Sequence, residues 1–441
     1  MQMGSAREVS PAGQTVPSGL AIFSYHQNGV LVSEAGVPAS SPMLRGRIYA
    51  NVAGAVNTGI ALANPNDSQA TVSFFFTDAT GTDFGNGSMI IPAHGQIAKF
   101  LNEAPFNAPG STNGTFTFSS NVPVGAIAIR GYTNQRSEFL VTTMPVADPS
   151  VQVADSVYFP HFADGGGWTT QFVLMNPSDR AISGTLTFFG QGTAGTAASN
   201  LALNIDGAVV SQVPYSIPAR SAKSFSTVSA TSQMKVGSAR ATPALWNTAP
   251  VGVAIFSFMS AGITVSSAGT PSMSTGNAFR MYAEADQSGN IQTGVAIENA
   301  AASDTSVNFQ LTDLNGTSIG LSGQLVIPAM GQRSVFLSQI PGFESLPRPF
   351  KGVLRISSAN LNISVLGIRG RSNERGDFLF TTTPATNENS PARSQIVFPH
   401  IVDGGGYTTQ FITFSGTPAE PTSAPLQMFT QSGGGLNIAV R

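Results

Sequence analysis

The chain of 441 residues contains no cysteine and little charge. The absence of cysteine excludes disulfide bonds, thiolate metal sites and cysteine nucleophiles. Charged residues make up only 10% of the chain, against about 25% in an ordinary soluble domain. The net charge of −2 gives no electrostatic footprint for nucleic acid, so we expect no nucleic-acid partner. Low charge also removes much of the repulsion between copies and therefore favours self-association.

Lysine and long apolar runs are scarce as well. The chain has only four lysines but 47 glycines, 28 prolines and 29 phenylalanines, which favours short strands and turns over helices. No run approaches the ~20 apolar residues of a membrane span, and the start at Met1 has no apolar signal core. We therefore expect no membrane span. If the protein is exported, its signal lies outside this sequence and Met1 need not be the biological start.

One unit of the sequence, which we name type A, occurs at 41–150 and again at 274–388. Repeats of this size indicate an array of similar structural modules. The offset between the two copies drifts only slightly, so the insertions fall in loops. The matching segments are 59–64 with 294–299, 91–96 with 327–332 (each containing Ile-Pro-Ala), 129–131 with 368–370, and 139–143 with 378–382.

A second unit, type B, occupies 151–273 between the two type A copies. It carries the phrase Phe-Pro-His-x-x-Asp-Gly-Gly-Gly-x-Thr-Thr-Gln-Phe at 159–172 and its own Ile-Pro-Ala at 217–219. Its Pro-Val-Gly-Val-Ala-Ile at 250–255 resembles a segment late in type A. The two types therefore look like divergent copies of one module.

The two ends of the chain look like complementary halves of a further type B module. Residues 389–441 restart type B with the same phrase at 398–411, and residues 1–40 match its later part. The chain thus reads as half-B, A, B, A, half-B. The two halves together lack the segment that corresponds to 206–233, which includes the Ile-Pro-Ala strand.

The expected fold class is all-β. Alternating apolar residues at 114–119 and nearly alternating ones at 71–77 predict half-buried strands, and turn residues recur every eight to twelve positions. About seven strands in about 110 residues predict tandem immunoglobulin-like or fibronectin-like β-sandwich domains. We expect two full type A and one full type B domain plus two terminal half-domains. A single helical turn is expected before Pro105 and again before Pro341.

The type B phrase at 159–172 and 398–411 is similar to repeats in uncharacterised bacterial secreted and surface proteins. The resemblance covers mainly the type B units. It carries no assigned activity or site, and it implies a bacterial, exported context. We therefore expect an extracellular protein of the bacterial cell surface.

Two sets of polar residues recur and allow more than one interpretation. His161 and His400 each precede an aspartate by three residues, which suggests either a metal site or a strand followed by an Asp-Gly-Gly-Gly turn with positive φ angles. The turn is favoured, and we expect no metal. The arginines Arg130, Arg369, Arg136 and Arg375 could bind an anionic ligand, but pairing with acids or covering apolar strand surface is favoured.

Catalytic patterns are missing from the sequence. It has no nucleophile elbow, no His-Glu-x-x-His and no phosphate loop before a helix. Its carboxylates are scattered singly, and none recurs as a pair suited to glycoside hydrolysis. We therefore expect no enzyme, no catalytic residues and no cofactor.

The half-domains carry the functional hypothesis. A half sandwich exposes its core and unpaired strand edges, which invite pairing with another chain. We predict a filament in which the C-terminal half of one subunit receives the N-terminal half of the next, so that copies of the chain are its own partners. The residues expected at this assembly interface are Leu20, Ile22, Phe23, Val30, Val32, Phe398, Phe411, Met428, Phe429, Leu436 and Ile438.

Other interpretations remain open. Packing of residues 1–40 onto 397–441 of the same subunit would defeat the polymer form of this hypothesis. The sequence could also be an excerpt of a longer surface stalk or of an adhesin that binds polysaccharide or another surface. The missing Ile-Pro-Ala strand is the weakest point of the assembly hypothesis.

Overall fold

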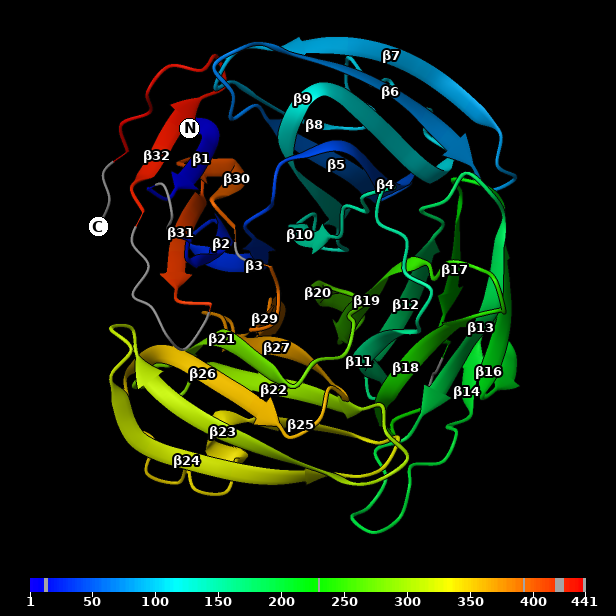
Figure 1. The fold of residues 1–441 in the computed structure, drawn as a ribbon, viewed down its shortest axis with the longest axis vertical. Coiled ribbons are helices and arrows are strands. Elements are labelled where there is room, and N and C mark those ends of the chain that lie inside the picture. Colours follow the sequence, from blue (N-terminus) through cyan, green and yellow to red (C-terminus); the bar gives the residue numbers. More distant parts are fainter. Residues whose placement is uncertain (12–14, 229–230, 392, 417–423, 439–441) are drawn as a thin grey trace.

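The computed structural model describes residues 1–11, 15–228, 231–391, 393–416 and 424–438. Apart from one three-residue 3-10 helix, all regular elements among these residues are strands. Figure 1 shows four groups of strands arranged around a common centre, so the modules form a closed ring. The predicted all-β class is confirmed, with several sheets consistent with β-sandwiches. The finer immunoglobulin-like or fibronectin-like assignment stays a prediction.

The first type A unit folds as one strongly bent sheet with the order β7-β6-β9-β4-β5-β8, and β10 pairs with β9. Strand β9 is 22 residues long and pairs first with β4 and β6, then with β5 and β10. One strand therefore serves both layers. The strands of the first type A unit are β4 (Met43–Ala53), β5 (Val56–Ala63), β6 (Ala70–Asp78), β7 (Asp83–Ile91), β8 (Gln96–Phe100), β9 (Thr112–Thr133) and β10 (Phe139–Met144).

The type B unit has two four-stranded sheets, β11-β18-β13-β16 and β17-β12-β19-β20, and a small β14-β15 hairpin. Phe159, Phe172 and Phe188 meet in its core and are fully buried. Its strands are β11 (Val157–Asp164), β12 (Trp168–Met175), β13 (Ile182–Phe189), β14 (Leu203–Ile205), β15 (Ala208–Val210), β16 (Gln212–Ile217), β17 (Ala222–Ser226), β18 (Lys235–Pro243), β19 (Val251–Ser260) and β20 (Ile263–Pro271).

The second type A unit repeats the first, except that two strands, β26 and β27, replace the single long strand. The predicted helical turn is the 3-10 helix η1 (Leu337–Gln339), whereas turns without a helix precede Pro105. The strands of the second type A unit are β21 (Ala278–Ala285), β22 (Ile291–Asn299), β23 (Thr305–Asp313), β24 (Ser318–Ile327), β25 (Gln332–Phe336), β26 (Phe350–Ser358), β27 (Ile363–Ser372), β28 (Phe378–Thr383) and β29 (Thr386–Asn387).

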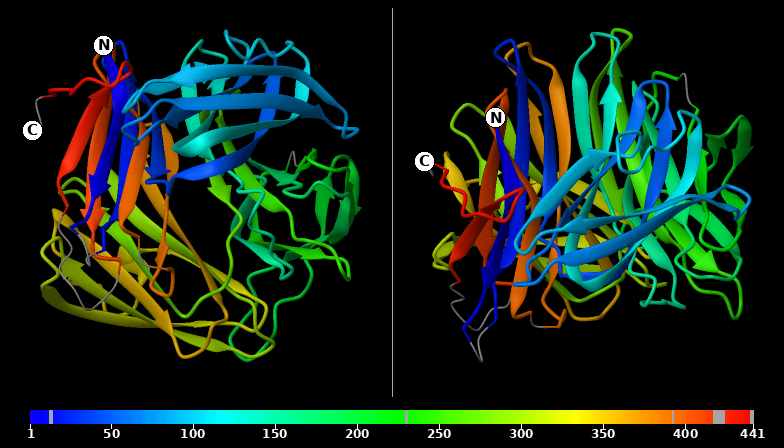
Figure 2. Two further views of the ribbon diagram at one scale, coloured as in Figure 1. Left: turned by 45° about the horizontal axis from the view of Figure 1, so that its top comes forward. Right: turned by 90° about the horizontal axis from the view of Figure 1, so that it is seen from above.

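The two ends of the chain build the fourth group, which we name the closing module (residues 1–40 and 389–441). Its sheets are β30-β1-β32 and β3-β2-β31, so N-terminal strands pair with C-terminal strands. Figures 1 and 2 show the blue strands beside the orange and red ones in every view. Its strands are β1 (Gln2–Val9), β2 (Ser18–Gln27), β3 (Val30–Pro38), β30 (Gln395–Asp403), β31 (Tyr407–Phe414) and β32 (Leu426–Thr430).

In this single chain the complementing half comes from the same subunit, whereas the predicted filament takes it from a second one. Strand β1 pairs with β30 on one side and with β32 on the other, all within one chain. Strand β2 likewise pairs with β31 from Ser18 to Tyr25. The ring brings the ends together because the four modules bend back on themselves. The central strands β1 and β2 therefore have a pairing strand on each side without a partner chain.

One strand from each group lines the centre of the ring, namely β3, β10, β20 and β28. Val141 donates its backbone N–H to the Ser33 hydroxyl (2.8 Å), and Phe380 does the same to Ser266 (2.8 Å). Paired threonines extend these contacts to two glycines of the type B strands. The bonds are Thr143 to the Gly36 carbonyl, the Gly36 N–H to Thr381, Thr382 to the Gly269 carbonyl, and the Gly269 N–H to Thr142.

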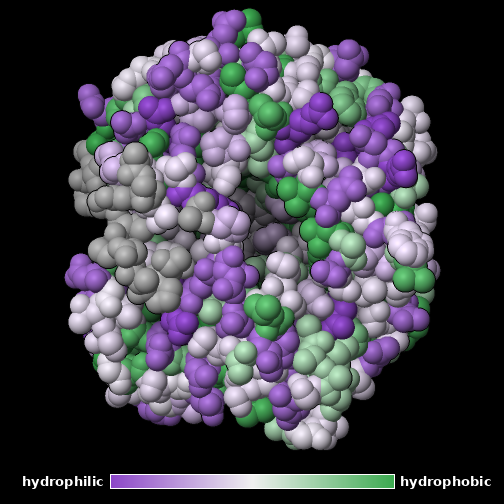
Figure 3. All heavy atoms as spheres, in the orientation of Figure 1, coloured by the Kyte–Doolittle hydropathy of each residue, from purple (hydrophilic) through white to green (hydrophobic). Residues whose placement is uncertain are grey.

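The glycines are required at this centre. A Cβ atom on Gly36 would clash with the carbonyl oxygen of Thr382, and one on Gly269 with that of Thr143. Each type B strand therefore contacts both type A strands closely. The surface of the face shown in Figure 3 is hollowed where the four groups meet.

Candidate functional site

The residues predicted for the assembly interface lie mostly in the core of the closing module. Phe23 and Phe398 are buried there, and Phe411 packs edge-to-face on Phe398 with ring centroids 5.0 Å apart. Met428, Leu436 and Ile438 are partly buried around this core. The contacts join the two ends of one chain.

The remaining predicted interface residues lie at the borders of the closing module. Leu20 and Ile22 pack against the second type A unit, and Phe429 stacks on His94 of the first one (centroids 4.9 Å apart). Val32 is buried beside the ring centre, and Val30 begins β3 at a half-buried position. These residues therefore hold the closing module to its neighbours.

The described residues of the closing module supply no equivalents of the strands that cover both sheet edges of the type B unit. There β16 pairs with β13, and β17 pairs with β12 from Gln171 to Met175. Among the described residues no strand takes the corresponding places beside β32 and β31. Phe411 is consequently half-buried, whereas its repeat counterpart Phe172 is fully buried. Within the described residues, the predicted gap leaves the outer edge of β31 without a strand. Among the same residues, the outer edge of β32 bonds only the turn that follows it, through the Leu436 N–H to the Met428 carbonyl (2.9 Å) and the Thr430 N–H to the Gly434 carbonyl (2.7 Å).

A buried asparagine accompanies each Ile-Pro-Ala strand. The Nδ2 atoms of Asn64, Asn176 and Asn299 each donate to the isoleucine and proline carbonyls of that strand in their own module. The corresponding position in the closing module is Ser415. The closing module therefore has no asparagine at this position, and its described residues form no Ile-Pro-Ala strand.

The Ile-Pro-Ala turns also contact the preceding module along the ring. Ser221 donates to the Asp78 carbonyl (2.6 Å), Gln332 to the Gln191 carbonyl (3.1 Å), and Gln96 to the Gln431 carbonyl (3.0 Å). At the fourth joint, the described residues supply no such turn. In the second type A unit, the turn that corresponds to the Asp78 turn of the first contains Leu314. The side chain of Leu314 is 50% exposed. Within the described residues, an apolar cluster that includes Leu20, Ile22 and Tyr282 joins this unit to the closing module instead.

The histidines of the type B phrase are structural in this fold. His161 is buried and stacks on Phe256, and His400 meets Phe23 edge-on. Burial lowers the pKa of each imidazole to about 4, so both rings are neutral near pH 7. In the described part of the chain, no three His, Cys, Asp or Glu side chains gather as metal ligands. The glycines at 165–167 and 404–406 have positive φ angles, which confirms the predicted turn.

Three of the four recurrent arginines pair with acids. Buried Arg369 contacts Glu34 and Glu284, while Arg136 and Arg375 both contact Glu138 and Asp377. The latter four residues come from equivalent loops of the two type A units, so this network ties those units together across the ring. Arg130 instead lies over the Tyr132 ring. The favoured interpretation of pairing and packing therefore describes all four arginines.

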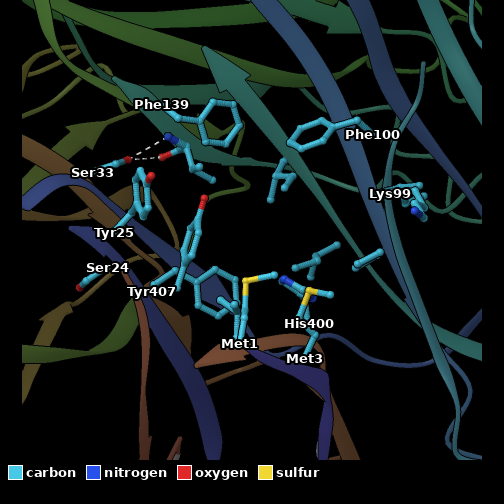
Figure 4. Close-up of a pocket in the computed structure, with 18 of the residues that line it drawn as sticks. Met1, Met3, Ser24, Tyr25, Ser33, Lys99, Phe100, Phe139, His400 and Tyr407 are labelled. Carbon is cyan, nitrogen blue, oxygen red and sulfur yellow. Dashed lines mark hydrogen bonds between the residues drawn. The ribbon is translucent and has the colours of Figure 1, made fainter. Parts of the chain in front are cut away.

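Two apolar cavities lie at repeat-related joints, where a type B module meets the following type A unit. The first has a volume of about 360 Å³ and lies between the closing module and the first type A unit. Figure 4 shows Phe100 and Phe139 on one side of it, Tyr25 and Tyr407 on another, and His400 with Met1 and Met3 on a third. The second, of about 240 Å³, lies between the type B unit and the second type A unit.

No sequence pattern indicated these cavities. Their aromatic residues were visible as repeats, for example Phe100 with Phe336 and Phe139 with Phe378. Recurrent apolar residues in a strand are equally typical of a buried core, so no signal marked them as lining a cavity.

Comparisons with known proteins assign no family. No protein-family model and no curated protein matches the sequence. A solved structure of glycoside hydrolase family 32 from Bifidobacterium adolescentis aligns with 73% of this chain and 98% of its own at 10% identity, with a TM-score of 0.16. That likeness is too low to support any inference. No helix within the described residues is long and apolar enough to cross a membrane.

Proposed function

We propose that the protein is an extracellular structural protein without catalytic activity, which works as a closed ring-shaped scaffold at the bacterial surface. The observation that carries this proposal is the pairing of β1 with both β30 and β32 in one chain. Low charge and the resemblance of the type B phrase to repeats of secreted proteins support the extracellular setting. Copies of the chain, a cell surface or a polysaccharide are the proposed partners.

The ring suits a scaffold because its modules are held at the centre as well as at the joints. Hydrogen bonds from Ser33, Ser266 and the threonine pairs link every central strand to its neighbours. Buried polar groups that are hydrogen-bonded across module boundaries in this way favour a single arrangement. Relative motion of the modules should therefore be small.

The head-to-tail filament is a second candidate, and the outer edge of β31, which no strand of the described residues covers, favours it. Strands 1–3 could leave their own ring and complete the closing module of another copy, which is a domain swap. The contacts would be those already described, made between chains instead of within one. Within the part of the chain that the structure describes, no strand covers β31 and no Ile-Pro-Ala turn completes the fourth joint, so the closing module should be the easiest place to open.

An engineered cysteine pair separates ring from filament, since the chain has no cysteine of its own. Val9 and Gln395 are paired residues of β1 and β30, and Val9 is exposed. The variant Val9→Cys/Gln395→Cys should form a disulfide within one chain in the ring and between chains in the filament. Non-reducing electrophoresis, with electron microscopy of the same sample, reads the difference.

The type B unit offers a matched control pair. Ser156 and Thr242 occupy the corresponding positions, and their hydroxyls are 3.0 Å apart. Ser156→Cys/Thr242→Cys should cross-link within one chain in either form. We expect both variants to run as monomers under non-reducing conditions. A ladder of cross-linked oligomers from the Val9/Gln395 variant alone would show that the chains assemble as the filament and not as the ring. If the control variant forms its disulfide and the Val9/Gln395 variant forms none, both the ring and the filament would be contradicted.

A further inference from the structure

We propose that the two cavities between a type B module and the following type A unit are binding sites for a compact apolar ring. This inference does not depend on whether the protein acts as a ring or as a filament. The first cavity is lined by the closing module and the first type A unit, and the second by the type B unit and the second type A unit.

The two cavities correspond residue by residue. Phe23 and His400 in the first correspond to Phe256 and His161 in the second, and every residue lining the second except Gly294 has a repeat counterpart lining the first. The fold thus builds the same site twice, with different sequences. Since divergent copies keep an apolar, aromatic lining, the cavity is a property of the joint.

The volumes and linings define the class of ligand. Apolar cavities of about 150 Å³ already hold a benzene-sized molecule, and ligand sites are generally apolar with a few polar groups. In the first cavity, Tyr25 and Tyr407 stack with ring centroids 4.3 Å apart, and Phe100 meets Phe139 edge-on at 5.8 Å (Figure 4). Aromatic faces and edges are the surroundings that an added ring prefers.

Charge is not a shared feature of the two sites. Lys99 and Glu103 line the first cavity, but their counterparts in the second are Val335 and Gln339. The shared polar group is the histidine. Gln96 Nε2 lies 3.0 Å from His400 Nδ1, and Gln332 Nε2 lies 3.2 Å from His161 Nδ1, which fixes each ring in place. The ligand common to both sites is therefore neutral and mostly apolar.

Two aromatic substitutions explain why the second cavity is smaller. Trp168 stands where the first has Tyr407, and Phe380 stands where the first has Val141. Trp168 packs on Phe258 and edge-on against Phe380, with centroids 4.7 and 5.5 Å apart. The first site should accordingly accept the larger ring of the two.

Methionine methyl NMR of the full chain tests the proposal. Met3 lines the first cavity and Met234 the second, whereas Met259 lines neither and is an internal control. With ¹³C-methyl methionine, titration with phenol or cyclohexanol should shift the Met3 and Met234 signals but not that of Met259. Methyl β-glucoside should shift none of them.

A pair of swap variants then locates binding. Val141→Phe introduces the residue that the second site already contains, and Phe380→Val does the reverse. With 2-naphthol as a larger probe, Val141→Phe should weaken the Met3 titration at least several-fold, and Phe380→Val should strengthen that of Met234. Equal shifts of all methionines, no shift with phenol or cyclohexanol, an unchanged Met3 titration in Val141→Phe, or shifts with the glucoside alone would overturn the proposal.

Discussion

Glu298 is the buried acid whose environment is least matched to its charge. Its side chain is fully buried and its closest cation, Arg240, is 3.7 Å away. Burial raises the pKa of the Glu298 carboxyl to about 8. The folded state therefore keeps the proton where the unfolded state loses it. Below about pH 4.5 the group costs nothing, and stability is lost as the pH rises toward 8.

Replacing Glu298 by glutamine should remove this loss. Glu298→Gln is expected to leave the free energy of unfolding nearly unchanged at pH 5 and to raise it clearly at pH 9. Each unit of pKa shift corresponds to roughly 1.4 kcal/mol. Urea unfolding at both pH values measures the difference between variant and parent. His161 and His400 act in the opposite direction between about pH 4 and 6.5, because burial lowers the pKa of each to about 4. If Glu298→Gln changed the free energy of unfolding equally at pH 5 and pH 9, the raised pKa of Glu298 would be contradicted.

At the scale of elements, the central strands depend on two glycines. Gly269→Ala should destabilise the protein by about 1–3 kcal/mol, because its Cβ would meet the Thr143 carbonyl and force the strands apart. Gly36→Ala should behave alike. Gly110→Ala, at an open position with nothing near the added Cβ, is the matched control and should stay within about 0.5 kcal/mol. Thermal or urea unfolding measures the stability of the three variants. Equal stabilities would show that the central strands can move apart to accept the added Cβ atom.

Much of the element structure could be predicted from local sequence. The alternation at 71–77 lies within β6, and the glycine triplet at 165–167 turns with positive φ as expected. Local patterns could not show that β9 serves two layers or that β1 meets β30 in the same chain. Strand complementarity is identical within and between chains, since it depends on edges and apolar faces and not on connectivity. The cavities escaped prediction because they require two modules to meet.

For the whole molecule, β1 is the strand that holds the ring closed. It lies between β30 and β32, and its Ala6 is buried in the core of the closing module. Deleting residues 1–9 should leave the other three modules folded but make the strands from 395 to 430 sensitive to protease. Limited proteolysis with mass spectrometry reads this directly. An unchanged cleavage pattern would mean that the closing module does not need β1.

The threonine and glycine contacts at the centre also set how such a molecule can grow. Each type B strand offers one glycine that bonds threonines from both type A neighbours, so like strands cannot stand side by side. Gene duplication of a single module would place two identical strands together and leave one set of these groups unmatched. Only an even number of alternating modules satisfies the pattern. We expect enlarged relatives, natural or designed, to gain modules as A–B pairs.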